Sequence, residues 1–308
     1  MDGNRKKGLW KKIVKNRVLL VMLLPALIYT VIFSYIPMTG IVLAFKRYDY
    51  GKGIYGSPWC GLHNFQYMIV SDKLWSLTRN TLCYNIVFII LGILAEVGFA
   101  IMLSELSRVT FKKVSQAFMF LPYFISWVVV STIMLNIFGE HGVLNNVITS
   151  LGGDPFNVYD HVKTWPLVIV MVKLWKSTGY GSVVYLAAIA GISQEMYEAA
   201  KIDGADIWRR IVHITIPCLK PTIFIMGLLA VGNVFRGDFG LFYQLVKNNQ
   251  KLLEYSDVID TFVYRTMITT SDFGMSAAAG FYQSVLCFVT ICIANGIVKK
   301  TNPDYTLF

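Results

Sequence analysis

Three charged residues lie inside long apolar stretches of this sequence, where a charge is costly and indicates a function or a specific contact. Lys173 and Lys176 are three residues apart, so they share one face of a helix. Their ammonium groups either line a polar cavity, where they would donate charge-assisted hydrogen bonds to an acidic solute, or they snorkel or form an ion pair. Glu96 is open to three interpretations: a polar packing contact, a carboxylate facing a partner, or a contact to a solute.

Several aromatic and amide side chains in apolar stretches are weaker candidates for contacts to a solute. Aromatic rings can stack on the faces of sugars, but they also gather at membrane interfaces without any ligand. The candidates that accompany the two lysines are Trp175, Tyr180, Asn233, Tyr282 and Gln283.

The composition is that of a polytopic membrane protein. Of 308 residues, 55% are hydrophobic and 15% are charged, whereas a soluble domain is about 25% charged. We attribute the net charge of +10 to membrane topology rather than to nucleic-acid binding, because seven basic residues precede the first apolar run. The five cysteines lack metal-ligand spacing, and no ATP-binding P-loop, hydrolytic motif or dinucleotide fingerprint occurs. We therefore expect no catalytic site, no metal and no cofactor in this chain.

Six apolar runs are long enough to cross a bilayer as helices, which takes about 20 residues. The predicted spans are residues 18–45, 81–103, 114–138, 165–190, 222–235 with adjoining residues, and 276–298. The basic run before the first span places the N-terminus in the cytoplasm, and Lys299 and Lys300 place the C-terminus there too. Counting the crossings puts Cys60 outside and Cys218 on the cytoplasmic side.

The chain divides into four parts on this basis. They are a cytoplasmic basic N-terminus (1–17), a first transmembrane helix with an extracellular loop (18–80), a five-helix core (81–298) and a cytoplasmic tail (299–308). The core contains a polar cytoplasmic loop, residues 191–220. It also contains an outside segment, residues 236–275, of which the short apolar stretch Phe239–Val246 is expected to be re-entrant.

The polar loop 191–220 contains residues typical of helix beginnings and ends. Ser193 and Asp206 are suited to cap two short helices, and Gly204 tolerates the left-handed conformation that ends the first of them. The second helix would be amphipathic at about 100° per residue, with Ile207, Trp208, Ile211, Val212 and Ile214 on one face and Arg209, Arg210 and His213 on the other.

The spacing of six residues in this loop, Glu198, Ala199, Ala200, Gly204, Ile214 and Pro217, resembles the EAA loop of ABC importer permeases. Through that loop an ATPase subunit grips its permease. Further matches at Asp238–Gly240 and at residues 257–261, 276–284 and 305–308 resemble maltose-type sugar permeases, most closely the polysaccharide/aldouronate-type branch. The resemblance implies an all-α polytopic membrane protein with six transmembrane helices and the type I ABC importer permease fold. It also implies that the six loop residues couple the chain to the ATPase.

The same resemblance implies the partners of the chain. They are a second homologous permease subunit, two ATP-binding subunits that hold the ATP, and an extracellular solute-binding lipoprotein that delivers an oligosaccharide. Two alternatives stay open. One is a permease with the same mechanism for another solute, such as a peptide or phosphate. The other is an ion-coupled secondary transporter, which would bury coupling carboxylates at the midplane, with Glu96 as the candidate.

Overall fold

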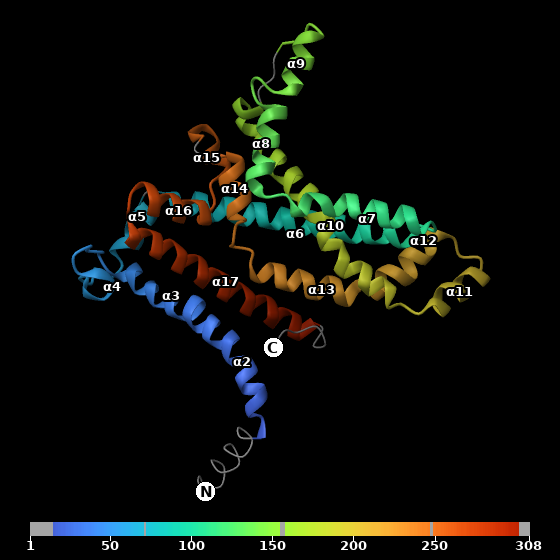
Figure 1. The fold of residues 1–308 in the computed structure, drawn as a ribbon, viewed down its shortest axis with the longest axis horizontal. Helices are drawn as coiled ribbons and strands as arrows, with labels where there is room; N and C mark the ends of the chain where they lie inside the picture. Colours follow the sequence, from blue (N-terminus) through green and yellow to red (C-terminus); the bar gives the residue numbers. More distant parts are fainter. Residues whose placement is uncertain (1–14, 71, 155–157, 247–248, 302–308) are drawn as a thin grey trace.

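The protein is built from helices. The computed structural model describes residues 15–70, 72–154, 158–246 and 249–301, and in these the only pairing of extended backbone is an isolated bridge between Lys46 and Trp59. Six helical segments are long and apolar enough to cross a membrane: Arg17–Phe45, Lys73–Glu105, Trp127–Ser150, Val162–Ala190, Ile207–Gly232 and Phe273–Lys300. The predicted all-α architecture with six transmembrane helices is confirmed (Figure 1). The basic residues up to position 14 and the ending 305–308 lie outside the described residues.

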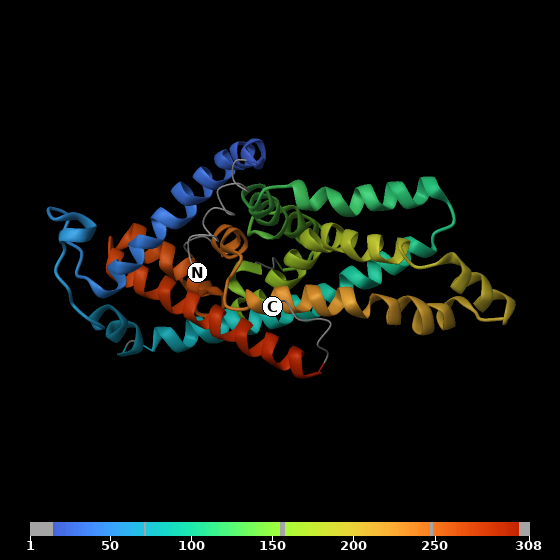
Figure 2. The same cartoon turned by 90° about the horizontal axis from the view of Figure 1, so that it is seen from below.

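Two long helices form the centre of the molecule. α6 (Lys73–Glu105) and α10 (Trp165–Ala190) pack against each other along much of their length, and α7 (Val109–Phe124) packs against α10 (Figures 1 and 2). α10 keeps the predicted bounds of the fourth span, whereas α6 begins eight residues earlier than predicted. Gly179 of α10 permits the close approach of α7, because a Cβ atom there would lie 1.9 Å from the carbonyl oxygen of Met119.

The first apolar segment lies largely apart from the rest of the chain. It consists of α2 (Arg17–Thr30), a π turn (Val31–Tyr35), α3 (Ile36–Met38) and a 3-10 turn (Thr39–Phe45). The 3-10 turn packs against α17 (Phe273–Thr301), while α2 and α3 contain no buried residue. Figure 1 shows α2 leading away from the body of the protein. Its apolar surface is therefore free for lipid or for another protein.

The predicted third span, residues 114–138, is wrong as a single helix. α7 ends at Phe124 and α8 (Trp127–Phe138) begins after two extended residues, Ile125 and Ser126. Pro122 has no N–H to continue the helical ladder, and the Ser126 hydroxyl caps α8 by accepting a hydrogen bond from Val129 N at 3.3 Å. α8 consequently points away from α7 and leads to α9 (Val143–Ser150) (Figure 1).

The fifth span also differs from the prediction. α12 (Ile207–Arg210) continues through a π turn (Ile211–Thr215) into α13 (Ile216–Gly232), so the second amphipathic helix of the loop is the first part of the fifth span. The π turn ends two residues before Pro217, whose ring would clash with the carbonyl four residues earlier in a regular α-helix.

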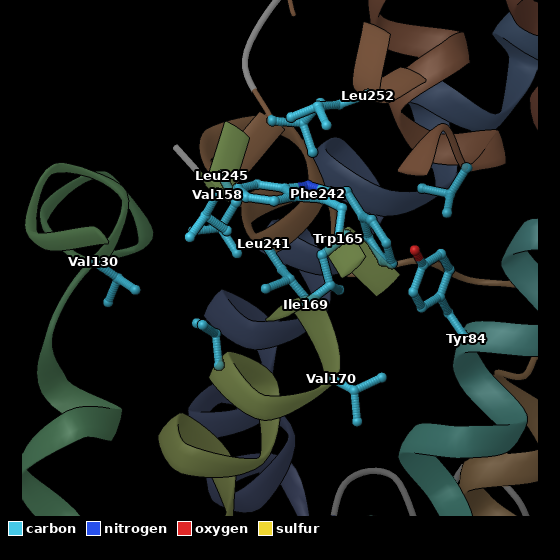
Figure 3. Packing of buried hydrophobic residues seen from close by; sticks show 13 residues of the cluster. Tyr84, Val130, Val158, Trp165, Ile169, Val170, Leu241, Phe242, Leu245 and Leu252 are labelled. Carbon is cyan, nitrogen blue, oxygen red and sulfur yellow. The ribbon is translucent and has the colours of Figure 1, made fainter. Parts of the chain in front are cut away.

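The largest buried cluster lies around the beginning of α10. It joins the N-terminal part of α10 to α14 (Phe239–Val246), the stretch predicted as short and apolar (Figure 3). Trp165, Ile169 and Leu241 are fully buried there, and Phe242 is 1% exposed. The remaining elements are α4 (Gly53–Gly56), α5 (His63–Val70), 3-10 turns at Val158–Asp160 and Val162–Thr164, α11 (Gln194–Ile202), α15 (Gln250–Ser256) and α16 (Ile259–Thr269).

Candidate functional site

The polar loop forms a capped helix that stands at one end of the molecule. The Ser193 hydroxyl accepts a hydrogen bond from Glu195 N at 3.3 Å and begins α11. Gly204 ends it with φ of 77°, and Ala205 N donates to Ala200 O at 2.8 Å while Gly204 N donates to Lys201 O at 3.1 Å. This pair of bonds is a Schellman motif, which fixes the direction of the chain as it leaves the helix.

The next helix begins at once. Asp206 caps α12 by accepting a hydrogen bond from Arg209 N at 2.8 Å, as predicted. Glu198 and Ala199 of the EAA pattern are exposed, Ala200 and Ile214 are half-buried, and Pro217 is exposed. Among the residues that the structure describes, no ion pair involves Glu198. α11 stands beyond the helical body (Figures 1 and 2), and it carries the exposed Glu198 and Ala199.

Two side-chain contacts fasten this loop to the spans. The Tyr197 hydroxyl of α11 lies 2.9 Å from the hydroxyl of Thr215, which is 1% exposed. Arg210 of α12 pairs with Glu105 at the end of α6, with 3.8 Å between the charged atoms. Side-chain contacts therefore connect α11 to the fifth span and α12 to α6. We call Ser193–Pro217 the coupling segment.

The two lysines of α10 are both engaged within the chain. Lys173 Nζ lies 2.8 Å from Asp238 Oδ2, so the ion pair is the alternative that the structure bears out for this residue. Asp238 is held in place because its Oδ1 accepts a hydrogen bond from Leu241 N at 3.1 Å, at the start of α14. Both charged side chains remain about a quarter exposed, at 27% and 26%.

Lys176 stabilises the break between α7 and α8. Its ammonium group donates to the carbonyl oxygens of Pro122, Tyr123 and Ile125 at 3.1, 2.7 and 2.6 Å. It also lies 5.1 Å from the ring of Trp127 and 5.5 Å from the ring of Tyr123, which are cation–π distances. The residue is only 8% exposed, so its three donors are used inside the protein.

An aromatic pair lies beside this lysine. The rings of Tyr123 and Tyr180 stack with centroids 3.9 Å apart and planes 3° from parallel, and the two residues are 40% and 51% exposed. Trp175 instead lines an apolar groove of about 460 Å³ between α8 and α10. The structure therefore brings Tyr180 together with the lysines and separates Trp175 from them.

Glu96 lies against α10. A Cβ atom on Gly181 would be 2.1 Å from its Oε1, so the carboxylate occupies space that only glycine leaves open. The carboxylate also interacts electrostatically with Lys173 and with the fully buried Tyr185. Of the three interpretations of Glu96, this geometry is that of a polar packing contact between α6 and α10.

The other predicted residues belong to different surroundings. Gln283 Nε2 donates to Phe235 O at 2.8 Å and to Asp260 Oδ2 at 2.7 Å, the oxygen that also accepts from Gly237 N at 2.6 Å. Burial raises the pKa of Asp260, and these hydrogen bonds oppose the shift. The Tyr282 hydroxyl lies 3.2 Å from Thr78 Oγ1, while Asn233 is exposed with its amide on Leu229 O at 3.2 Å.

Comparison with known proteins identifies the family. The family model described as "Binding-protein-dependent transport system inner membrane component" matches residues 88–303. The chain belongs to this family. Protein LplB of Bacillus subtilis is 34% identical over 97% of this chain and 94% of its own. The Polygalacturonan/rhamnogalacturonan transport system permease protein YteP of the same organism is 31% identical over 97% and 93%.

Solved structures agree with the fold of this inner membrane component. A chain in the crystal structure of a bacterial alginate ABC transporter, in complex with an alginate pentasaccharide-bound periplasmic protein, superposes with a TM-score of 0.85. It is 30% identical, and the match covers 95% of this chain and 98% of that one. The predicted ABC importer permease is confirmed over the secondary-transporter alternative.

Sequence reasoning about this permease missed several residues around the lysines. Asp238, Tyr123 and Trp127 surround the two ammonium groups, although they lie 46 to 65 residues away along the chain. Asp238 was visible only as part of the family match Asp238–Gly240. An acidic residue at the start of a short apolar stretch is a signal for a helix cap, but it does not name the lysine that the cap pairs with.

Proposed function

We propose that this permease forms half of a translocation path for an oligosaccharide and is driven by ATPase subunits that grip the coupling segment. The observation that carries the proposal is a rigidly capped α11 with an exposed Glu198 that has no ion-pair partner in the described part of the chain. The relatives support the class of solute, since their names specify polygalacturonan or rhamnogalacturonan, and alginate. Both termini would lie in the cytoplasm of a bacterial cell.

The coupling segment would act as a lever. The Schellman motif and the Asp206 cap hold α11 and α12 in one relative orientation, so closure of an ATPase pair would move them together. The contacts from Tyr197 to Thr215 and from Arg210 to Glu105 would then carry the motion into two spans. Glu198, Ala199, Ala200 and Gly204 form the gripped surface in this proposal, and Ile214 and Pro217 belong to the helix that it moves.

The partners follow from the same architecture. The exposed apolar surface of α2 supports pairing with a second homologous permease, because a helix without buried residues can bury its surface only against lipid or another chain. Two ATP-binding subunits would hold the ATP, and a solute-binding lipoprotein would deliver the sugar. The alginate transporter in complex with its periplasmic protein supports this arrangement.

The solute path would pass the face of α10 that carries Lys173 and Tyr180. Stacking on the exposed Tyr123–Tyr180 pair and hydrogen bonds from Lys173 would bind a sugar, and a uronate would compete with Asp238 for the ammonium group. Lys176 would support this face by its hydrogen bond to the carbonyl oxygen of Tyr123. Trp175 and Asn233 stay candidates because they are exposed, whereas Tyr282 and Gln283 would act by holding neighbouring helices.

Two substitutions in the coupling segment test the proposal. Glu198→Lys reverses the exposed charge, and Gly204→Trp places a bulky side chain at a left-handed turn. Both variants should assemble in the membrane but lose solute-stimulated ATP hydrolysis, measured on the reconstituted complex. Glu140→Lys, which reverses the charge of an exposed carboxylate between α8 and α9, is the matched control. Wild-type stimulation in both variants would contradict the coupling role.

Thiol labelling and uptake competition test the orientation and the solute. Cys60 should react with a membrane-impermeant reagent in intact cells, and Cys218 only after permeabilisation. The reverse pattern would invert the topology. Unlabelled oligosaccharides, but not peptides or phosphate, should compete with uptake of the native solute.

A further inference from the structure

A basic groove lies between α7, α10 and the coupling segment, at the C-terminal end of α10. Its volume is about 640 Å³. The polar part of its lining includes Lys112, Lys201, Arg210 and Glu105, and the apolar part includes Val183 and Leu186. The groove lies where α6 and α10 end, at Glu105 and Ala190, which is the level at which these spans leave the membrane.

The charges in this basic groove are not balanced. It contains three cations and one carboxylate, and Glu105 pairs with Arg210 at 3.8 Å. In the part of the chain that the structure describes, no carboxylate lies within ion-pair distance of Lys112 or Lys201. Two ammonium groups in the groove are therefore available to bind an anion.

The apolar wall of the groove, formed by α10, restricts which class of ligand the groove can bind. Val183, Leu186, Ala187 and Ala190 follow one another along α10 from the membrane interior toward the charged residues. A soluble anion would contact the lysines and leave this wall unused. A ligand with an anionic head and an apolar tail satisfies both parts, and basic pockets between transmembrane helices at the cytoplasmic side suit anionic lipid head groups.

We propose that the basic groove binds an anionic phospholipid of the inner leaflet. The phosphate would lie between Lys112 of α7 and Lys201 of α11, and an acyl chain would lie along Val183 and Leu186. The lipid would thereby join α7 to the coupling segment. The inference rests on the proposed function in one respect, since the proposed topology puts this end of the protein in the cytoplasm.

Lipid retention by the purified transporter tests this site. The assembled complex is titrated with phosphatidylglycerol or phosphatidylcholine in detergent, and bound lipid is counted by native mass spectrometry. The double variant Lys112→Gln, Lys201→Gln should bind phosphatidylglycerol about 25-fold more weakly, at about fivefold for each ammonium group near a charged surface. Phosphatidylcholine binding should be weak throughout.

A second double variant, Lys113→Gln with Lys220→Gln, is the control. It changes the net charge equally, but both lysines are exposed and lie outside the lining of the groove. Equal phosphatidylglycerol binding by the wild type and the groove variant would overturn the proposal, and so would an equal loss in the control. Cross-linking of Lys112→Cys to an ATPase or permease partner would overturn it too, because a protein would then fill the groove. Retention is measured without transport, so its failure leaves the coupling role of Glu198 standing.

Discussion

The coupling segment differs from the lysine face of α10, the face that carries Lys173 and Lys176. The charged groups of the two regions differ in whether they have partners within the chain. Glu198 of the coupling segment is exposed and makes no ion pair in the described chain, and α11 is held mainly by its own caps. Lys173 and Lys176 are held by a carboxylate and by three carbonyl oxygens from other parts of the fold. The first region leaves a charged group exposed, and the second satisfies its charged groups with other parts of its own chain.

The difference follows from the surroundings of each region. A polar group at a membrane-protein end can exchange water for a partner at little cost, so it can stay open until the partner arrives. A charged group near the middle of a transmembrane helix cannot replace a missing partner with water, and burying it without a partner costs several kcal/mol. An exposed polar group without a partner therefore supports an interface at the coupling end, whereas the buried and fully hydrogen-bonded Lys176 supports a structural role.

Lys176→Met should show the largest difference in stability between the two regions. The change removes the donor shared by three carbonyl oxygens at the α7–α8 break, of which Pro122 O keeps a second hydrogen bond, from Ile125 N at 3.3 Å. We expect a loss of about 3–5 kcal/mol in the free energy of unfolding, since each unsatisfied buried acceptor costs about 1–3 kcal/mol. Glu198→Lys should leave stability unchanged. Thermal unfolding of the purified complex measures both, and equal melting temperatures would contradict the capping role of Lys176.

Gly179→Ala tests the helix contact that places the lysine face. The new methyl group would meet the carbonyl oxygen of Met119 at 1.9 Å, so α7 and α10 must separate. We expect a loss of about 2–3 kcal/mol from overpacking. Gly98→Ala on α6 is the matched control, because a Cβ atom there has nothing within 4 Å. If both variants unfold at the wild-type temperature, α7 and α10 do not approach this closely.

A double-mutant cycle on Lys173 and Asp238 measures the ion pair itself. Lys173→Met and Asp238→Asn should each destabilise the protein, and their combination should cost less than the sum, with a coupling of about 1 kcal/mol for a partly exposed pair. Uptake should fall in Lys173→Met while protein level holds. Additive effects would show that the pair contributes nothing, and unchanged uptake would remove Lys173 from the solute path.

Gly204→Ala should have the smallest effect on stability. Space for a methyl group is free, so the only penalty is the left-handed φ of 77°, about 1 kcal/mol for a residue with a Cβ atom. The turn lies outside the helical body, and the expected result is a normal melting temperature with reduced solute-stimulated ATP hydrolysis. Gly204→Asn tolerates this conformation better and should restore part of the stimulation. A fall in melting temperature larger than that of Gly179→Ala would reverse the contrast between the two regions.

Local chemistry in the sequence determined much of this protein. Six apolar runs require six spans because the bilayer accepts only long apolar helices. The caps at Ser193, Gly204 and Asp206 follow from hydrogen bonds and backbone freedom within a few residues, so the capping positions of the coupling segment were predictable. The bounds of α10 were predictable for the same reason.

Only the tertiary structure decided what the charges inside the spans do. The face shared by Lys173 and Lys176 is a local property, but their partners Asp238, Pro122 and Tyr123 come from segments 53 to 65 residues away. The break that divides the predicted third span needs Lys176 from another helix to satisfy its carbonyl groups. Helical periodicity reports which residues share a face, whereas the identity of the element facing them depends on how the helices pack.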